Sequence, residues 1–230
     1  MFNLQTNQTE VLDSYVSKVM KRVYLKMFFA MIVTAVTSYV CFNVPSVRYA
    51  IASNSAIYWG LLIAELVLVF VLSGALHKLS SFTASMIFYV YSILNGVVLS
   101  VILALYTESS IFSTFVITAG VFGTMTIYGY VTKSDLTRIG SFLFMALIGL
   151  IICTVINIFL HSSALEWIIS FAGVAIFIGL TAWDTQKIKR MAAMVDETQA
   201  GKLATIGALS LYLDFVNLFL YLLRFFGNRN

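Results

Sequence analysis

Residues 142–158 read FLFMALIGLIICTVINI, a run without a charged side chain. A bilayer core requires about 20 mostly apolar residues per helix, and the apolar character continues on both sides of this run. A membrane β-strand would instead show about 10 residues in which polar and apolar positions alternate, a pattern that is missing here. Apart from Glu65, residues 59–75 have the same continuous apolar character. These stretches predict membrane-spanning α-helices.

The composition of the whole chain supports the same conclusion. Of its 230 residues, 60% are hydrophobic and 10% are charged, whereas soluble domains are about 45–50% apolar and about 25% charged. Seven runs are long enough to span a bilayer, namely 23–43, 56–76, 84–106, 111–131, 140–160, 164–184 and 205–226. We therefore predict an all-α polytopic membrane protein with a cytoplasmic segment at 1–22, a seven-helix transmembrane domain at 23–226 and a short tail at 227–230.

Basic residues predict the orientation of the spans. Eleven of the 14 Lys and Arg residues fall on one side, and cytoplasmic loops are enriched in these residues. That side contains Lys18, Lys21, Arg22, Lys26, Lys78, Lys133, Arg138, Lys187, Lys189, Arg190 and Lys202. This predicts a cytoplasmic N-terminus and an external C-terminus, and it explains the basic excess without a nucleic-acid partner. Because Arg224 lies in the last turn of the final span, a re-entrant segment with a cytoplasmic C-terminus is the alternative.

Three carboxylates lie within the predicted spans, at Glu65, Asp184 and Asp214. A charged side chain at the bilayer centre costs about 2.5–3.5 kcal/mol even on the mildest scale, so such residues usually face the bundle interior and mark an ion or proton path. Glu65 needs a partner from another helix, for which Asn95 is a candidate, or it must stay protonated. Asp184 precedes basic residues at 187–190, and an interfacial ion pair with them is the alternative to a functional role.

The last span carries a polar stripe at helical spacing, formed by Gly207, Ser210, Asp214, Asn217 and Tyr221. Small and polar residues also form packing seams between membrane helices. We favour such a seam for Gly207, Ser210 and Asn217, with an ion path as the alternative for Ser210 and Asn217. Asp214 differs, because an amide or hydroxyl would supply packing hydrogen bonds without the cost of a buried carboxylate. We therefore predict a functional role for Asp214.

A close pair of carboxyl groups would share a proton, because two like charges within a few ångströms cannot both ionise easily. A pair formed by Asp184 and Asp214 would act as a pH switch and could be a weak Ca²⁺ site, although Ca²⁺ usually takes 6–8 oxygen ligands. Depth argues against this pairing: Asp184 lies at the inner boundary and Asp214 about seven to nine residues inside, roughly 10–13 Å deeper. Helix tilt or a water-filled vestibule would have to close that gap.

Enzyme chemistry finds no support in the sequence. It contains no phosphate-binding loop, no zinc-protease motif and no nucleophile elbow. Cys41 and Cys153 are isolated, so neither a disulfide framework nor a metal cluster is expected from them. We therefore predict that the protein is not an enzyme and that it needs no cofactor.

Three motifs carry a family resemblance. Gly179–Gln186 reads GLTAWDTQ, Ala208–Leu220 reads ALSLYLDFVNLFL, and Tyr130–Leu136 reads YVTKSDL. Together they resemble the Bax inhibitor family, also called the transmembrane Bax inhibitor motif family, and in particular its bacterial members. The resemblance implies a seven-helix bundle with a central last helix and a pH-sensitive Ca²⁺ leak. It also implies that Asp184 and Asp214 are a proton-sharing pair that sets closed against open states.

The sequence departs from that family at one position. The resemblance implies an arginine near the inner end of the second helix that latches onto the acid pair, but residues 75–78 read ALHK here. Lys78 would replace this arginine only as a less directional point charge. We therefore predict a weaker latch at Lys78, with His77 beside it as the other candidate.

These observations lead to one functional prediction and two alternatives. We predict a channel-like protein that leaks Ca²⁺ passively and whose gate responds to protonation of Asp184 and Asp214. The alternatives are a non-conducting protein that binds another membrane protein, such as a quality-control protease, and a proton-coupled transporter of a small solute. The expected partners are the lipid bilayer, Ca²⁺ and protons, and the expected location is the bacterial cytoplasmic (inner) membrane.

Overall fold

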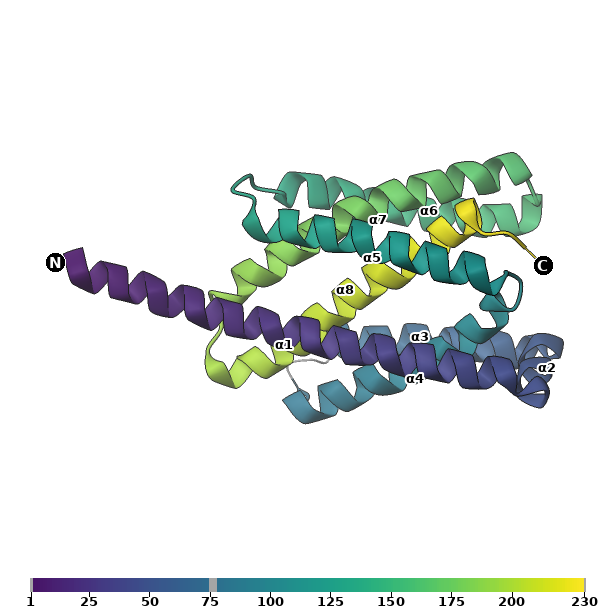
Figure 1. The fold of residues 1–230 in the computed structure, drawn as a ribbon, viewed down its shortest axis with the longest axis horizontal. Coiled ribbons are helices and arrows are strands. Elements are labelled where there is room, and N and C mark those ends of the chain that lie inside the picture. Colours follow the sequence, from purple (N-terminus) through teal and green to yellow (C-terminus); the bar gives the residue numbers. More distant parts are fainter. Residues whose placement is uncertain (1, 75–77, 230) are drawn as a thin grey trace. The chain divides into compact units, whose positions relative to one another are not determined.

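A computed structural model of the chain describes residues 2–74 and 78–229, with the backbone alone at residues 2–9, 48, 52 and 58. Within these residues the chain is almost entirely helical and contains no β-strand (Figure 1). The helices are α1 (Phe2–Asn43), α2 (Pro45–Ser53), α3 (Ser55–Gly74), α4 (Ser81–Leu103), α5 (Glu108–Val131), α6 (Thr137–Leu160), α7 (Ser163–Ala192) and α8 (Glu197–Phe226).

Seven of the described helices, all except α2, are long and apolar enough to cross a membrane. The prediction of an all-α polytopic membrane protein is therefore confirmed. The short helix α2 lies in what was predicted as a plain connection between the first two spans. It begins with Pro45, a residue that suits the first helical position because the missing N–H would have had no intrahelical partner there.

Five of the helices, α1, α5, α6, α7 and α8, are longer than the apolar runs that predicted them, whereas α4 lies three residues earlier than the predicted 84–106. The predicted segment 1–22 and the first span lie on one helix, α1. Helix α7 continues from the predicted end at 184 to Ala192, and α8 starts at Glu197 rather than at 205. The reason is that bilayer thickness limits the apolar part of a helix, whereas Lys, Arg, Gln, Met and Ala are good helix formers that continue it into polar surroundings.

The chain divides into two compact units. The first unit comprises Met1–Leu105 and Arg190–Leu209. In it α1 packs on α4, α4 packs on α3, and α2 contacts all three. A Cβ atom at Gly96 of α4 would lie 2.7 Å from the backbone oxygen of Thr34, so the absence of a side chain permits this close approach of α1.

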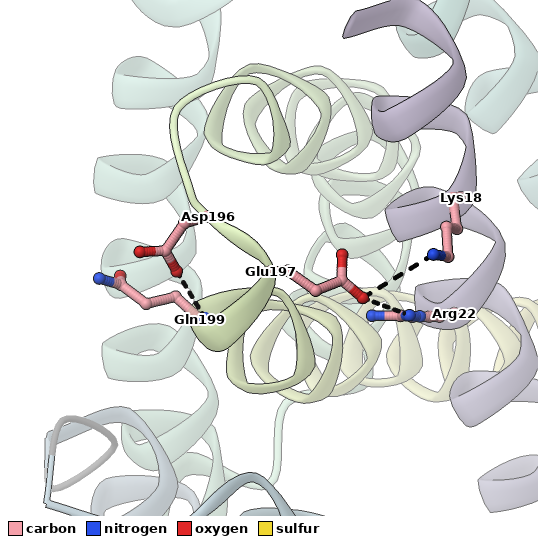
Figure 2. Close-up of polar contacts among 5 residues, drawn as sticks. All are labelled: Lys18, Arg22, Asp196, Glu197 and Gln199. Atoms are coloured by element: carbon pink, nitrogen blue, oxygen red, sulfur yellow. Dashed lines mark hydrogen bonds and ion pairs between the residues drawn. The ribbon is translucent and has the colours of Figure 1, made fainter. Parts of the chain in front are cut away.

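The first half of α8 completes the first unit. Lys26 of α1 donates through Nζ to Ser85 Oγ on α4 and to Thr205 Oγ1 on α8, both at 2.6 Å. Figure 2 shows the start of α8, where Glu197 lies 2.7 Å from Arg22 Nη2 and 3.9 Å from Lys18 Nζ. These contacts join α8 to two helices that precede it by more than 100 residues in the chain.

The second unit comprises Tyr106–Lys189 and Ser210–Asn230, and thus α5, α6, most of α7 and the second half of α8. Residues without a side chain again mark the close contacts. A Cβ atom at Gly129 of α5 would collide with the backbone of Ala182, and one at Gly140 of α6 would collide with the ring of Trp183. Phe215 of α8 packs edge-on against Phe122 of α5, with 5.3 Å between the ring centroids.

Helix α8 is the most buried of the seven long helices. In the most apolar 18-residue stretch of α8, 67% of the residues are buried, compared with 6% in the corresponding stretch of α6. Its first half is packed in one unit and its second half in the other. The last helix therefore contributes buried residues to both units.

Candidate functional site

Asp184 and Asp214 both belong to the second unit. Asp184 on α7 is half-buried, and Asp214 on α8 is only 4% exposed. Their carboxyl groups are close enough to interact electrostatically. The structure thus brings together the two acids whose estimated depths in the sequence were about 10–13 Å apart.

The packing of α7 on α8 explains this proximity. Phe177 lies seven residues before Asp184, and Tyr221 lies seven residues after Asp214. The rings of Phe177 and Tyr221 stack with 5.9 Å between their centroids. Because seven residues are about two helical turns, antiparallel helices in this register have Asp184 and Asp214 opposite each other. Helix α8 starts at Glu197, earlier than the predicted start at 205, and this added part belongs to the first unit.

The carboxyl group of Asp214 is poorly satisfied. Within the part of the chain that the structure describes, its Oδ2 atom is buried and has no hydrogen-bond partner. The buried hydroxyls of Thr181 and Thr185 on α7 donate to carbonyl oxygens of α7 itself, at 2.7 and 2.8 Å. A buried acceptor without a partner is costly, so Asp214 occupies a position that packing alone would give to an apolar residue.

The cation that acts on both carboxyl groups is Lys187. It lies on α7 one turn after Asp184, and its Nζ atom is 4.8 Å from the centroid of the Trp183 ring. The sequence placed Lys187 among the possible ion-pair partners of Asp184, but it did not predict that this charge also acts on Asp214, because spacing along one helix does not show which side chains of another helix lie nearby. Gln186 and Lys189, which also contact the end of α5 and the α5–α6 connection, were missed for the same reason.

The other predicted site residues are divided between the two units. Asn217 donates to Leu213 O of its own helix at 2.8 Å, and Ser210 is half-buried. Glu65 lies in the first unit, where Asn95, the candidate partner named from the sequence, donates to it at 3.4 Å. Lys78 is exposed and also belongs to the first unit, and His77 lies outside the described residues.

A resident metal would find few side-chain ligands. Among the described residues no group of three or more His, Cys, Asp and Glu side chains is placed to hold a metal ion. Ca²⁺ takes 6–8 oxygen ligands, so the two carboxyl groups would need several carbonyl or water oxygens besides their own. The two carboxyl groups by themselves therefore supply fewer oxygen ligands than Ca²⁺ usually takes.

The opposite end of the second unit is closed by the C-terminal residues. Thr107 donates its backbone N–H to Asn228 O at 3.0 Å, and Asn228 donates its own to Ser110 Oγ at 2.9 Å. Arg229 lies 3.6 Å from Glu166, which is in the first turn of α7. The end of α8, the start of α5 and the start of α7 thus lie together at this end of the unit.

Comparisons with known proteins place the chain in a family. Residues 16–230 match the family described as "Inhibitor of apoptosis-promoting Bax1". The inner membrane protein YbhL of Escherichia coli K12 is 47% identical over 213 residues, with 91% of each chain covered. A protein of Borreliella burgdorferi is 44% identical over 231 residues, covering 100% of this chain and 99% of its own, and a membrane protein of Streptococcus pyogenes, M6_Spy0327, is 42% identical over 180 residues, or 78% of each chain. The chain belongs to the Bax inhibitor family.

Proposed function

We propose that this protein lets Ca²⁺ leak passively across the membrane and that the Asp184 and Asp214 pair adjusts the leak to pH. The observation that carries this proposal is Asp214: its carboxyl group is buried, leaves one oxygen without a partner among the described residues, and interacts with a second carboxyl group. Buried acids of this kind in membrane helices usually belong to ion or proton pathways. Membership of the Bax inhibitor family supports the same function.

The chemistry of the gate follows from the charge of the pair. With one shared proton, the two groups carry a single negative charge and a hydrogen bond can join them. Without that proton, two negative charges face each other where the effective dielectric constant is low, and their repulsion favours separation of α7 and α8. Lys187 provides a counter-charge that limits this repulsion. The protonation state thus changes both the charge along the path and the contact between two helices.

Purified protein in liposomes tests this function. Ca²⁺ entry would be followed with an enclosed indicator from pH 5 to pH 8, against empty liposomes. We expect entry above the empty liposomes that changes with pH in this range. No entry at any pH would refute the leak and leave a non-conducting partner protein, whereas entry that requires an added solute would indicate a transporter.

We also propose that the protein resides in the bacterial cytoplasmic membrane with the α5–α6 connection in the cytoplasm and the C-terminus outside. The printed name of the E. coli relative describes an inner membrane protein, and the excess of Lys and Arg on one side supports the orientation. In this arrangement the end of the second unit that carries Gln186, Lys187 and Lys189 faces the cytoplasm.

A further inference from the structure

Gln186 joins α7 to the connection between α5 and α6. Its side chain is 5% exposed. The amide donates through Nε2 to Ser134 O at 2.8 Å and accepts through Oε1 from Leu136 N at 2.9 Å. One side chain therefore satisfies two backbone groups of residues 132–136. These residues belong neither to a helix nor to a sheet, where backbone groups would bind one another.

Lys189 adds a second connection one turn further along α7. Its Nζ atom donates to Tyr130 O at 2.8 Å and lies 4.4 Å from the centroid of the Tyr130 ring. Tyr130 is in the last turn of α5, whose final carbonyl oxygens have no intrahelical donor. A cation is favourable at that end because the helix dipole is negative there. We call Gln186 and Lys189, with the backbone groups that they bind at Tyr130, Ser134 and Leu136, the α7 lock.

The α7 lock lies next to Asp184. Ala182 and Trp183 precede this residue and press against Gly129 and Gly140, where no side chain intervenes. Gln186 and Lys189 follow it; Gln186 is bonded to the connection between those same two helices, and Lys189 to the last turn of α5. Contacts that come before and after Asp184 along α7 thus hold this helical turn against α5 and α6.

We propose that Gln186 and Lys189 are positioning residues, which hold Asp184 in register with Asp214 by locking the α5–α6 connection onto α7. The physiological meaning of this positioning role rests on the proposed function. The charged residues next to the lock in the sequence are all exposed: Lys133 and Asp135 of the connection, Arg138 of α6, and Lys187 and Arg190 of α7. Of these, Lys187 acts on both carboxyl groups. Releasing the connection lets this turn of α7 shift, and the interaction between the two acids changes with it.

The first test asks whether the lock exists. Leu136 is 5% exposed, so the thiol of Leu136→Cys, in a chain with Cys41→Ala and Cys153→Ala, reacts with a water-soluble maleimide in nanodiscs only when the connection leaves α7. We expect Gln186→Leu to increase the labelling rate by at least about tenfold, because two ordinary hydrogen bonds to the connection are lost. Gln199→Leu is the matched control, since Gln199 is exposed at the start of α8 (Figure 2). Equal rates in Gln186→Leu and the control would overturn the lock.

The second test asks whether the lock positions the pair, and it does not depend on ion flux. Trp183 is adjacent to Asp184 and its ring lies beside Gly140, so with Trp59→Phe and Trp167→Phe its fluorescence reports on this turn. We expect a transition between pH 5 and pH 8 that Asp214→Asn abolishes and whose midpoint Gln186→Leu moves by about one pH unit, a tenfold change in proton affinity. An unchanged midpoint in Gln186→Leu would refute the positioning role.

Two milder variants keep the proposal testable if Gln186→Leu does not fold. Lys189→Met removes one connection and leaves Gln186 intact, whereas Gln186→Glu keeps the acceptor for Leu136 N and loses the donor to Ser134 O. Each should increase the labelling rate by a smaller factor than Gln186→Leu does, and the labelling rate is the quantity compared because both variants also change the charge near Asp184. A shifted midpoint in a protein that shows no Ca²⁺ entry would support the positioning role and refute only the proposed leak.

Discussion

The carboxyl group of Asp214 combines burial with an oxygen that has no hydrogen-bond partner among the described residues. An unsatisfied buried acceptor costs about 1–3 kcal/mol. Asp214→Leu should therefore raise the free energy of unfolding in mixed micelles by an amount in this range while it removes the proposed sensor. Such a gain is typical where function has been kept at the expense of stability.

The matched control for this variant is Asp13→Leu, which replaces an exposed aspartate of α1. It should change the unfolding free energy by less than about 0.5 kcal/mol, as most surface substitutions do. If Asp214→Leu destabilised the protein by several kcal/mol, the carboxyl group would have an essential structural partner, and its assignment as a sensor would lose its physical basis.

Asp196 is an acid of a different kind, at the start of α8. Its Oδ1 atom accepts from the Thr198 hydroxyl at 2.6 Å and from Gln199 N at 3.0 Å. These two hydrogen bonds hold the pKa of Asp196 below its ordinary value of 3.8. A lowered pKa means that its stabilising effect is complete above the ordinary value and is lost as pH falls through the lower folded value. Asp196 therefore stays ionised from pH 5 to pH 8.

Thermal melting checks this assignment. Asp196→Ala should lower the melting temperature at pH 7, because the helix loses its N-cap, and the difference from wild type should shrink as the pH falls below 3.8 and through the lowered pKa of Asp196. Asp196→Asn should retain most of the stability, since asparagine caps helices about as well as aspartate. A melting difference that grew toward acidic pH would show that the pKa is raised instead.

At the scale of the helices, close backbone contacts fix how α5 and α6 meet α7. A Cβ atom at Gly129 would collide with Ala182, whereas one at Gly123 of the same helix would meet nothing within 4 Å. Gly129→Ala should therefore destabilise the protein by about 1–3 kcal/mol through overpacking. Gly123→Ala should be neutral or stabilising by up to about 1 kcal/mol, because alanine has the higher helix propensity.

The same comparison is available on α6. A Cβ atom at Gly140 would collide with the ring of Trp183, whereas one at Gly149 would meet nothing within 4 Å. Unfolding in mixed micelles should again separate the two alanine variants, with Gly140→Ala the less stable. Equal stability within either pair would mean that α7 does not approach the two helices as closely as the structure indicates.

Within the second unit, the ends of the helices can be related to the two sides of the membrane. The C-terminal residues are bonded to the start of α5 and lie against the start of α7, whereas the connection at 132–136 is bonded to the far part of α7. Cysteines at Ser162 and Asn228 should react with an impermeant maleimide from outside the cell. A cysteine at Lys133 should react only after permeabilisation. Labelling of Asn228→Cys only after permeabilisation would support the re-entrant alternative.

Hydropathy predicted the number of long apolar helices, because the bilayer imposes a minimum length on each span. It did not predict that α7 and α8 continue as helices to Ala192 and from Glu197, since helix propensity is independent of apolarity there. The depth estimate separated Asp184 from Asp214, whereas the register of α7 on α8 brings them together. Register depends on contacts such as Phe177 with Tyr221, which are distant in the sequence. The roles of Gln186 and Lys189 were hidden for the same reason.

Calcium entry into liposomes that contain wild type, Asp214→Asn or Asp196→Asn shows whether Asp214 is the pH sensor of a Ca²⁺ leak. Each variant removes one aspartate charge, one inside the bundle and one at an exposed helix cap. We expect entry to change between pH 5 and pH 8 in wild type and in Asp196→Asn, and to be independent of pH in Asp214→Asn. Wild-type pH dependence that persisted in Asp214→Asn would contradict the assignment of the sensor.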